Sequence, residues 1–186
     1  MKRVLLAAIL LAATAGTASA GGFVGLGIGG SPGVSSDSHM EADGRTGRIE
    51  GGYSFGRFAI EGLGQRFDAY NTSDFSGYTN TTLGIAGLFR LPLTDGFGVY
   101  GRAGFQHTSL SVDDDSAYMR SDQHYNGTGL LFGGGADFRL PIAAANLSLF
   151  VDYTIATTNL TIDELPQVAP YRFTTRSWLL GAKLAF

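Results

Sequence analysis

Three histidines are the residues of this sequence best suited to general base catalysis. They are His39, His107 and His124, and His107-Thr108-Ser109 places an imidazole two residues from a hydroxyl nucleophile. A serine hydrolase needs such a base near the serine and an acid that orients the base. No partner carboxylate is evident beside this tripeptide, so solvated histidines at loop edges are the favoured reading, and the chain is not expected to be an enzyme.

Two other motifs could bind a metal or a cofactor. Asp113-Asp114-Asp115, with Asp122 nearby, offers oxygen ligands for Ca²⁺, but the glycine turn and terminal Glu of an EF-hand loop are missing. Residues 25–30 fit the G-x-G-x-x-G fingerprint of dinucleotide sites, which requires a strand before it and a helix after it. Here Ser31-Pro32-Gly33 follows instead, so neither a metal nor a cofactor is predicted.

The N-terminus resembles a secretory signal peptide. Lys2 and Arg3 are followed by an apolar run and then by Ala18-Ser19-Ala20, which predicts cleavage after residue 20 and one domain over residues 21–186. Removing Lys2 and Arg3 leaves 11 basic against 16 acidic side chains, a formal charge of −5, which does not favour nucleic acid as a partner. The absence of cysteine excludes disulfides and N-terminal lipidation.

The rest of the chain alternates apolar and polar residues with period two, which predicts an all-β fold. Turn residues divide it into eight strands. The predicted strands are Gly22–Gly30, Arg45–Phe55, Phe58–Phe67, Tyr78–Arg90, Phe97–Leu110, Tyr125–Leu140, Leu147–Thr158 and Phe173–Phe186.

The connections between these strands alternate in length. The long ones are expected at Ser31–Gly44, Asp68–Gly77, Ser111–His124 and Asn159–Arg172, and the others are short turns. Short turns at one end and long loops at the other are typical of bacterial outer-membrane barrels, which have short periplasmic turns and longer extracellular loops. The sequence therefore predicts an eight-stranded antiparallel up-and-down transmembrane β-barrel.

Lys183 decides which face of the last strand meets lipid. A lysine facing lipid at the membrane midplane costs about 2–4 kcal/mol, so Lys183 is expected to point into the lumen and Trp178 to face lipid. The same test on every strand predicts a lumen charge network of five basic and four acidic residues. Its members are Arg48, Glu50, Glu61, Arg90, Arg102, Asp137, Arg139, Asp152 and Lys183.

Near balance of charge predicts a lumen filled by ion pairs, because an eight-stranded barrel is just wide enough for its own side chains. Small residues on the first strand, Gly25, Gly27 and Gly29, are expected to make room for them. The alternative class, a soluble barrel of the lipocalin kind, requires an apolar interior and a polar exterior, which is the inverse pattern.

With its strands laid out in this way, the chain resembles the OmpA-like family of small outer-membrane barrels, which includes OmpX and the Ail-type adhesins. The most specific local match is the C-terminus, where Gly181, Leu184 and Phe186 resemble the assembly signal that the barrel-assembly machinery recognises. Leu179 and Leu184 depart from the usual pattern, which has a polar residue at the first position and often an aromatic at the second.

The resemblance implies a Gram-negative outer-membrane protein in contact with lipid and lipopolysaccharide. We expect it to display four extracellular loops for envelope integrity or adhesion to a host or matrix ligand. Tyr70, Phe75, Tyr118 and Tyr125 are candidate contact residues in or beside those loops. The alternatives are a narrow porin-like channel and a lipid A-modifying hydrolase using His107.

Overall fold

The computed structural model describes residues 21–30, 32–35, 43–71, 76–114, 122–140, 146–162 and 171–186, with side chains left out at some strand ends beside the gaps. The predicted signal peptide lies outside these residues. No helix long and apolar enough to cross a membrane is found in the described ranges.

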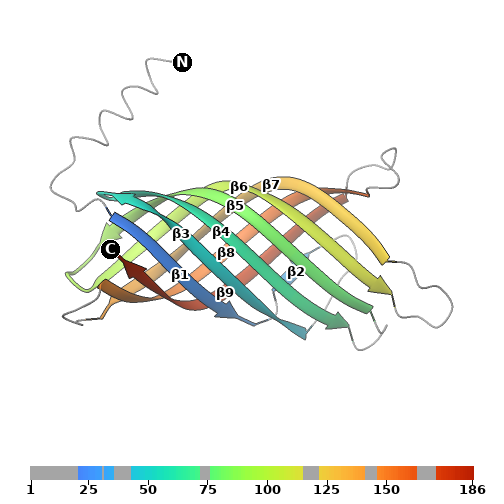
Figure 1. The fold of residues 1–186 in the computed structure, drawn as a ribbon, viewed down its shortest axis with the longest axis horizontal. Helices are drawn as coiled ribbons and strands as arrows, with labels where there is room; N and C mark the ends of the chain where they lie inside the picture. Colours follow the sequence, from blue (N-terminus) through green and yellow to red (C-terminus); the bar gives the residue numbers. More distant parts are fainter. Residues whose placement is uncertain are drawn as a thin grey trace, which may run out of the picture.

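Eight long antiparallel strands close into a barrel (Figure 1). Each long strand pairs with the long strands before and after it in the chain, and β1 pairs with β9 to close the wall. The up-and-down barrel predicted from the sequence is confirmed. The strands are β1 (Gly21–Gly29), β2 (Gly33–Ser35), β3 (Asp43–Phe55), β4 (Phe58–Asn71), β5 (Ser76–Pro92), β6 (Phe97–Asp114), β7 (Asp122–Arg139), β8 (Asn146–Ile162) and β9 (Tyr171–Ala185).

The short strand β2 lies where the sequence predicted only a loop. On β9, Leu180 pairs with Ile28 of β1 and Arg176 pairs with Gly33 of β2. Between these two pairs lie three residues of β9, 177–179, and four residues of the other strand, 29–32. One extra residue in one strand is the arrangement of a β-bulge. Pro32 lies in this interruption, where its missing N–H costs no ladder hydrogen bond. β2 therefore continues the first barrel strand beyond a break.

The strands also extend further than predicted at the long-loop end. Pairing continues through polar sequence, as where Ser111 of β6 lies opposite His124 of β7 and Asp113 opposite Asp122. The predicted boundaries were placed where apolar alternation stops, but polar β-branched residues such as threonine also favour strands. The predicted loops Asp68–Gly77, Ser111–His124 and Asn159–Arg172 are therefore shorter than expected, and the wall extends beyond its apolar part.

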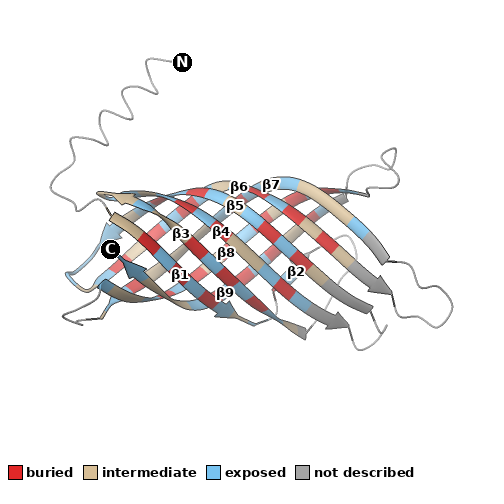
Figure 2. Cartoon of the chain, in the orientation of Figure 1, coloured by how far each residue is buried: buried red, intermediate tan, exposed pale blue. Residues whose placement is uncertain are grey.

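Inward and outward residues alternate along every long strand, as the red and blue bands of Figure 2 show. Leu26, Phe105 and Trp178 are 65 %, 69 % and 64 % exposed on the outside, whereas Glu61 and Asp152 are fully buried inside. A polar interior under an apolar exterior is stable only where lipid surrounds the barrel. This pattern excludes a soluble barrel of the lipocalin kind.

Candidate functional site

Arg102 lies at the centre of a group of charged side chains that crosses the lumen. Its guanidinium contacts Glu61 at 2.7 Å, Asp152 at 2.6 Å and Glu50 at 3.6 Å. All four side chains are inaccessible to solvent. They belong to β6, β4, β8 and β3, so this one arginine joins walls on different sides of the barrel.

Arg48 is the second bridge across the lumen. Its Nε lies 3.3 Å from Glu50, its Nη2 lies 2.8 Å from Asp152, and its Nη1 donates a 3.1 Å hydrogen bond to Thr154 Oγ1. Asp152 also accepts hydrogen bonds from Tyr100 Oη at 2.9 Å and from Thr154 Oγ1 at 2.7 Å. Buried charges are tolerated when they are paired in this way and their remaining lone pairs are satisfied.

Lys183 completes the group at the side of the short turns. Its Nζ lies 2.8 Å from Glu50 Oε1 and is surrounded by three rings, with centroids 4.7 Å away for Phe23, 5.3 Å for Phe150 and 5.5 Å for Tyr100. Ammonium groups are attracted to ring faces at these distances. We call the set that Lys183 completes the charge network, and it has three cations and three anions: Arg48, Arg102, Lys183, Glu50, Glu61 and Asp152.

Glycines of the inner wall make room for the charge network. A Cβ on Gly25 would lie 2.9 Å from Glu50 Cγ, and one on Gly135 would lie 2.6 Å from the Tyr100 hydroxyl. Both approaches are shorter than carbon side chains tolerate, so a larger residue at either position would displace a member of the network or its tyrosine partner.

Three further predicted lumen residues lie at the mouth of the barrel. Arg90 and Asp137 form an ion pair at 2.7 Å, separate from the charge network. They line a recess of about 320 Å³ together with Arg139, Lys183 and other residues. Arg139 is exposed and makes no ion pair with any described residue, so the prediction that it belongs to the network is not met by its geometry. Its position at the end of β7, in reach of water, is the physical reason.

The other half of the lumen, toward the long-loop end, contains a polar layer and no charged side chain among those the structure describes. Gln106 Nε2 donates a 2.8 Å hydrogen bond to Thr158 Oγ1, and the hydroxyls of Thr82 and Thr108 lie 3.3 Å apart. Thr82 Oγ1 also donates to Asn80 Oδ1 at 2.9 Å. We call these five residues the hydroxyl–amide layer.

Apolar layers lie on both sides of the hydroxyl–amide layer. Following β4, β6 and β8 outward from the charge network, the inward positions become small or apolar, then polar, then apolar again. The inner apolar layer consists of Leu63, Ala86, Leu131 and Ala156. The outer apolar cluster consists of Phe67, Leu110, Leu160 and Phe173, with Tyr125 packed against it. Successive layers of buried side chains therefore fill the described lumen.

The sequence places Gln106 inward, on the same parity as Arg102, but the other members of these neutral layers were not predicted. Threonine and alanine are tolerated facing either lipid or the lumen, so the parity test had no charge by which to place them. Tyr125 was a candidate contact residue of the loops, but it packs inward. The side chains of Tyr70, Phe75 and Tyr118 lie outside the described residues.

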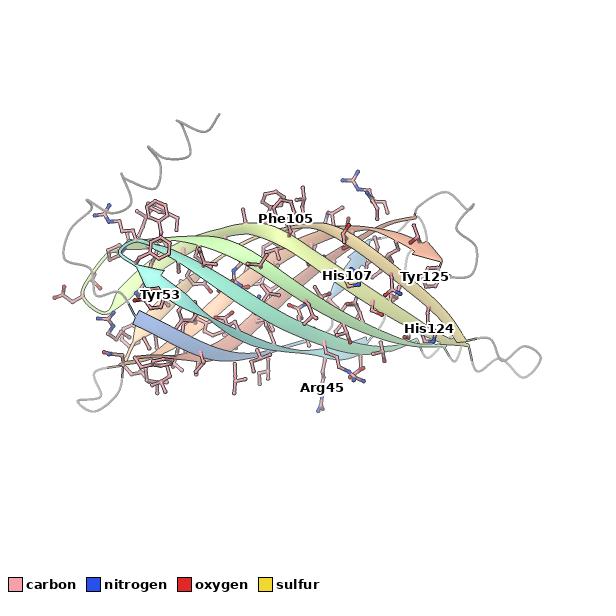
Figure 3. All side chains as sticks on the ribbon, turned by 45° about the horizontal axis from the view of Figure 1, so that its top comes forward. Arg45, Tyr53, Phe105, His107, His124 and Tyr125 are labelled. Carbon is pink, nitrogen blue, oxygen red and sulfur yellow. The ribbon has the colours of Figure 1, made fainter. Side chains whose placement is uncertain are left out.

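His107 and His124 both lie on the outer surface (Figure 3). His107 lines a shallow hollow of about 610 Å³ with Leu83, Phe105 and Leu130, and no hydrogen bond to Ser109 is present among the described side chains. His124 Nδ1 is instead hydrogen-bonded to Ser111 Oγ at 3.0 Å. His39, and the side chains of Asp113, Asp114, Asp115 and Asp122, lie outside the described residues.

The residues of the predicted assembly signal lie at the closing seam. Gly181 pairs with Gly27 of β1, whereas Leu184 and Phe186 are 41 % and 75 % exposed on the outer surface. The Phe186 N–H donates a 2.9 Å hydrogen bond to the carbonyl of Gly22. Recognition of these residues by an assembly factor stays a prediction.

Comparisons with known proteins place this geometry among outer-membrane barrels. A search of the curated proteins found no match. Among solved structures, Neisserial surface protein A aligns with a TM-score of 0.68 at 18 % identity, over 91 % of this chain and all of that one. The attachment invasion locus protein Ail of Yersinia pestis, in complex with the heparin analogue sucrose octasulfate, aligns at 0.59 and 17 %, over 91 % and 100 %.

A major outer-membrane protein of Thermus thermophilus aligns with a TM-score of 0.58 and 16 % identity, over 91 % of this chain and all of that one. At such identities these likenesses establish the fold alone. The family model of the outer membrane protein beta-barrel domain matches residues 4–186. The chain belongs to the outer membrane protein beta-barrel domain family.

Proposed function

We propose that this protein is a non-enzymatic component of the Gram-negative outer membrane that displays four extracellular loops on a closed barrel. In this proposal residues 1–20 direct export and are removed, and the loops serve envelope integrity or adhesion. The filled lumen carries the proposal. Charged, apolar and hydroxyl–amide layers occupy the interior, so the wall and the loops are the parts left to act on the surroundings.

The length of the strands supports the display of loops on a rigid scaffold. The strands β6 and β7 each have 18 residues, whereas about 9–11 residues span a membrane. The additional length raises the loops above the apolar part of the wall. Ail, a protein of this fold, is named for attachment and was solved with a heparin analogue, which supports sulfated polysaccharide as the first ligand class to test.

The experiment for adhesion compares cells that express the full chain with cells in which residues 115–121, between β6 and β7, are replaced by Gly-Gly. Binding to immobilised heparin and to laminin is measured. A loss of binding with unchanged surface abundance supports adhesion. Equal binding by both cell types, repeated for the three other long loops, contradicts it.

A narrow porin-like channel is the first alternative, and planar-bilayer recording distinguishes it. The filled lumen predicts no stable conductance from the purified barrel. Sizeable single-channel steps from the unaltered chain would overturn the closed-lumen proposal, even if the barrel is found in the outer-membrane fraction.

A hydrolase of outer-leaflet lipid is the second alternative, favoured by the hydrogen bond between Ser111 and His124. Both side chains are on the outer surface, where a serine nucleophile and a histidine base would meet a lipid headgroup. Mass spectra of lipid A from expressing cells decide the matter. Altered acyl chains that revert in Ser111→Ala and His124→Ala, or in His107→Ala, would establish an enzyme, and unchanged spectra would exclude one.

We also propose that the barrel-assembly machinery recognises the last strand through Gly181, Leu184 and Phe186. An unpaired strand edge can add a strand from another protein until closure covers the edge. Phe186→Ala should therefore lower the amount of folded, heat-modifiable barrel in cells but leave refolding of the purified chain into detergent unchanged. Equal loss in both settings would show that the residue serves stability instead.

A further inference from the structure

The outer surface beyond the apolar part of the wall differs from one side of the barrel to the other. On β5, β6, β7 and β8 the outward side chains described there include no Asp, Glu, Lys or Arg. On β3, β4 and β9 four arginines face outward and are exposed. They are Arg45, Arg66, Arg172 and Arg176, and we call them the arginine arc.

The arginine arc begins where the lipid-facing residues end. On β9, Arg176 lies two positions beyond Trp178 in the direction of the long loops. Trp178 is 64 % exposed, its ring centroid lies 4.5 Å from that of Tyr153, and tryptophan is typical of a membrane interface. On the outward face of β3, the exposed Ile49 is followed by Gly47 and then by Arg45 in the direction of the long loops. Figure 3 shows Arg45 directed away from the barrel. Arg176 and Arg45 therefore lie just beyond the apolar part of the wall, where lipid headgroups begin, at the end of the barrel opposite the C-terminus.

Most of the positive charge in the arc is not compensated by any described side chain. Arg66 pairs with Asp68 at 3.1 Å, and Asp68 also accepts a 3.0 Å hydrogen bond from Thr79. Arg45, Arg172 and Arg176 make no ion pair with any described side chain. An excess of positive charge here is notable because the chain as a whole carries a formal charge of −3.

Glycines separate the arginines and leave the backbone between them open. Gly47 lies directly opposite Arg66, and Gly33 lies directly opposite Arg176. A Cβ on Gly47 would meet no atom within 4 Å, and one on Gly33 would only touch Arg176 at 3.9 Å. No pairing joins β2 to β3 among the described residues.

We propose that the arginine arc binds the phosphate groups of a phosphorylated glycolipid of the outer leaflet, with its sugars over Gly33 and Gly47. Guanidinium groups favour phosphate because two parallel N–H donors match two phosphate oxygens. We choose a glycolipid over a phospholipid because the arginines lie on three strands and are separated by Gly33 and Gly47. This arrangement fits a broad headgroup that carries separated phosphates. The inference rests on the proposed outer-membrane location.

The test uses the full mature barrel in dodecylmaltoside micelles, with bound lipid counted by native mass spectrometry. The probes are bis-phosphorylated lipid A, the same lipid without its phosphates, and phosphatidylglycerol. The variant is Arg45→Gln with Arg176→Gln. The matched control is Arg57→Gln with Arg139→Gln, which removes the same charge from two exposed arginines at the short-turn end.

The arc variant should bind phosphorylated lipid A about tenfold or more weakly, since each arginine near anionic lipid contributes about 1 kcal/mol. The control should bind it as the parent does. Equal losses in both variants, equal binding of lipid A without phosphates, or equal binding of phosphatidylglycerol would each overturn the proposal. Both variants should be recovered as heat-modifiable barrels in the outer-membrane fraction. That result would show that the proposed location is correct, so a failure to bind lipid A could then be assigned to the arginine arc alone.

Discussion

The two halves of the lumen are equally buried but are built in opposite ways. Toward the short turns, a few charged side chains each make several contacts, and Arg102 alone touches three carboxylates. Toward the long loops, small hydroxyls form hydrogen bonds between uncharged groups, and apolar side chains pack in clusters. Single substitutions should therefore lower the free energy of unfolding strongly in the charged half and only slightly in the neutral half. The reason is that removing one arginine leaves several buried carboxylates with fewer cations nearby.

The largest effect is expected for Arg102→Met. This change leaves Glu61 with no cation within ion-pair distance among the described residues, and removes one partner each from Glu50 and Asp152. Breaking a buried pair from one side costs about 3–5 kcal/mol, which urea unfolding of the refolded barrel in detergent would measure. A loss of unfolding free energy below about 1 kcal/mol would contradict the expectation that the charged half is highly sensitive to substitution.

A second substitution keeps this prediction testable if Arg102→Met folds poorly. Adding Glu61→Gln replaces the carboxylate that Arg102 holds at 2.7 Å, so one fewer buried charge is stranded. The double variant should unfold at higher urea than Arg102→Met alone. No recovery would indicate that the volume of the arginine matters more than its charge.

Phe173→Ala tests the outer apolar cluster and should have the next largest effect. Phe173 is 4 % exposed and packs with Phe67, Leu110 and Leu160. Truncating a buried phenylalanine costs about 3–5 kcal/mol where the cavity stays empty, and a loss of about 3 kcal/mol is expected. A cost above that of Arg102→Met in the same urea assay would reverse the ranking of the two halves.

Thr158→Val tests the hydroxyl–amide layer. It removes the acceptor of the 2.8 Å hydrogen bond from Gln106 while keeping the volume of the side chain. Leaving a buried amide donor with a weaker partner costs about 1–2 kcal/mol. Gln106 also lies 3.4 Å from Thr108 Oγ1, an alternative acceptor that should hold the loss near 1 kcal/mol. A loss of stability as large as that of Arg102→Met would show that the neutral half is as sensitive to substitution as the charged half.

The contrast also explains what the sequence could predict. Arg48, Glu50 and Asp152 were placed inward because a charge cannot face lipid, and that constraint holds whatever the tilt of the strands. Their partners could not be named, because contacts across the lumen depend on the stagger between strands far apart in the chain. Thr158 and Leu131 were missed because a small hydroxyl or an aliphatic group satisfies either face.

The smallest effect is expected for Arg66→Gln, which breaks an ion pair of similar length on the outside of the barrel. Arg66 and Asp68 lie 3.1 Å apart, but their side chains are 64 % and 61 % exposed. Exposed pairs contribute little because water and salt screen them and two flexible side chains must be ordered. Unfolding in urea should change by less than about 0.5 kcal/mol, and less again at high salt. Arg102→Met should keep its full cost at high salt, because its partners are dry. If salt weakened both variants alike, water would have to reach the charge network, and the lumen would be open rather than filled.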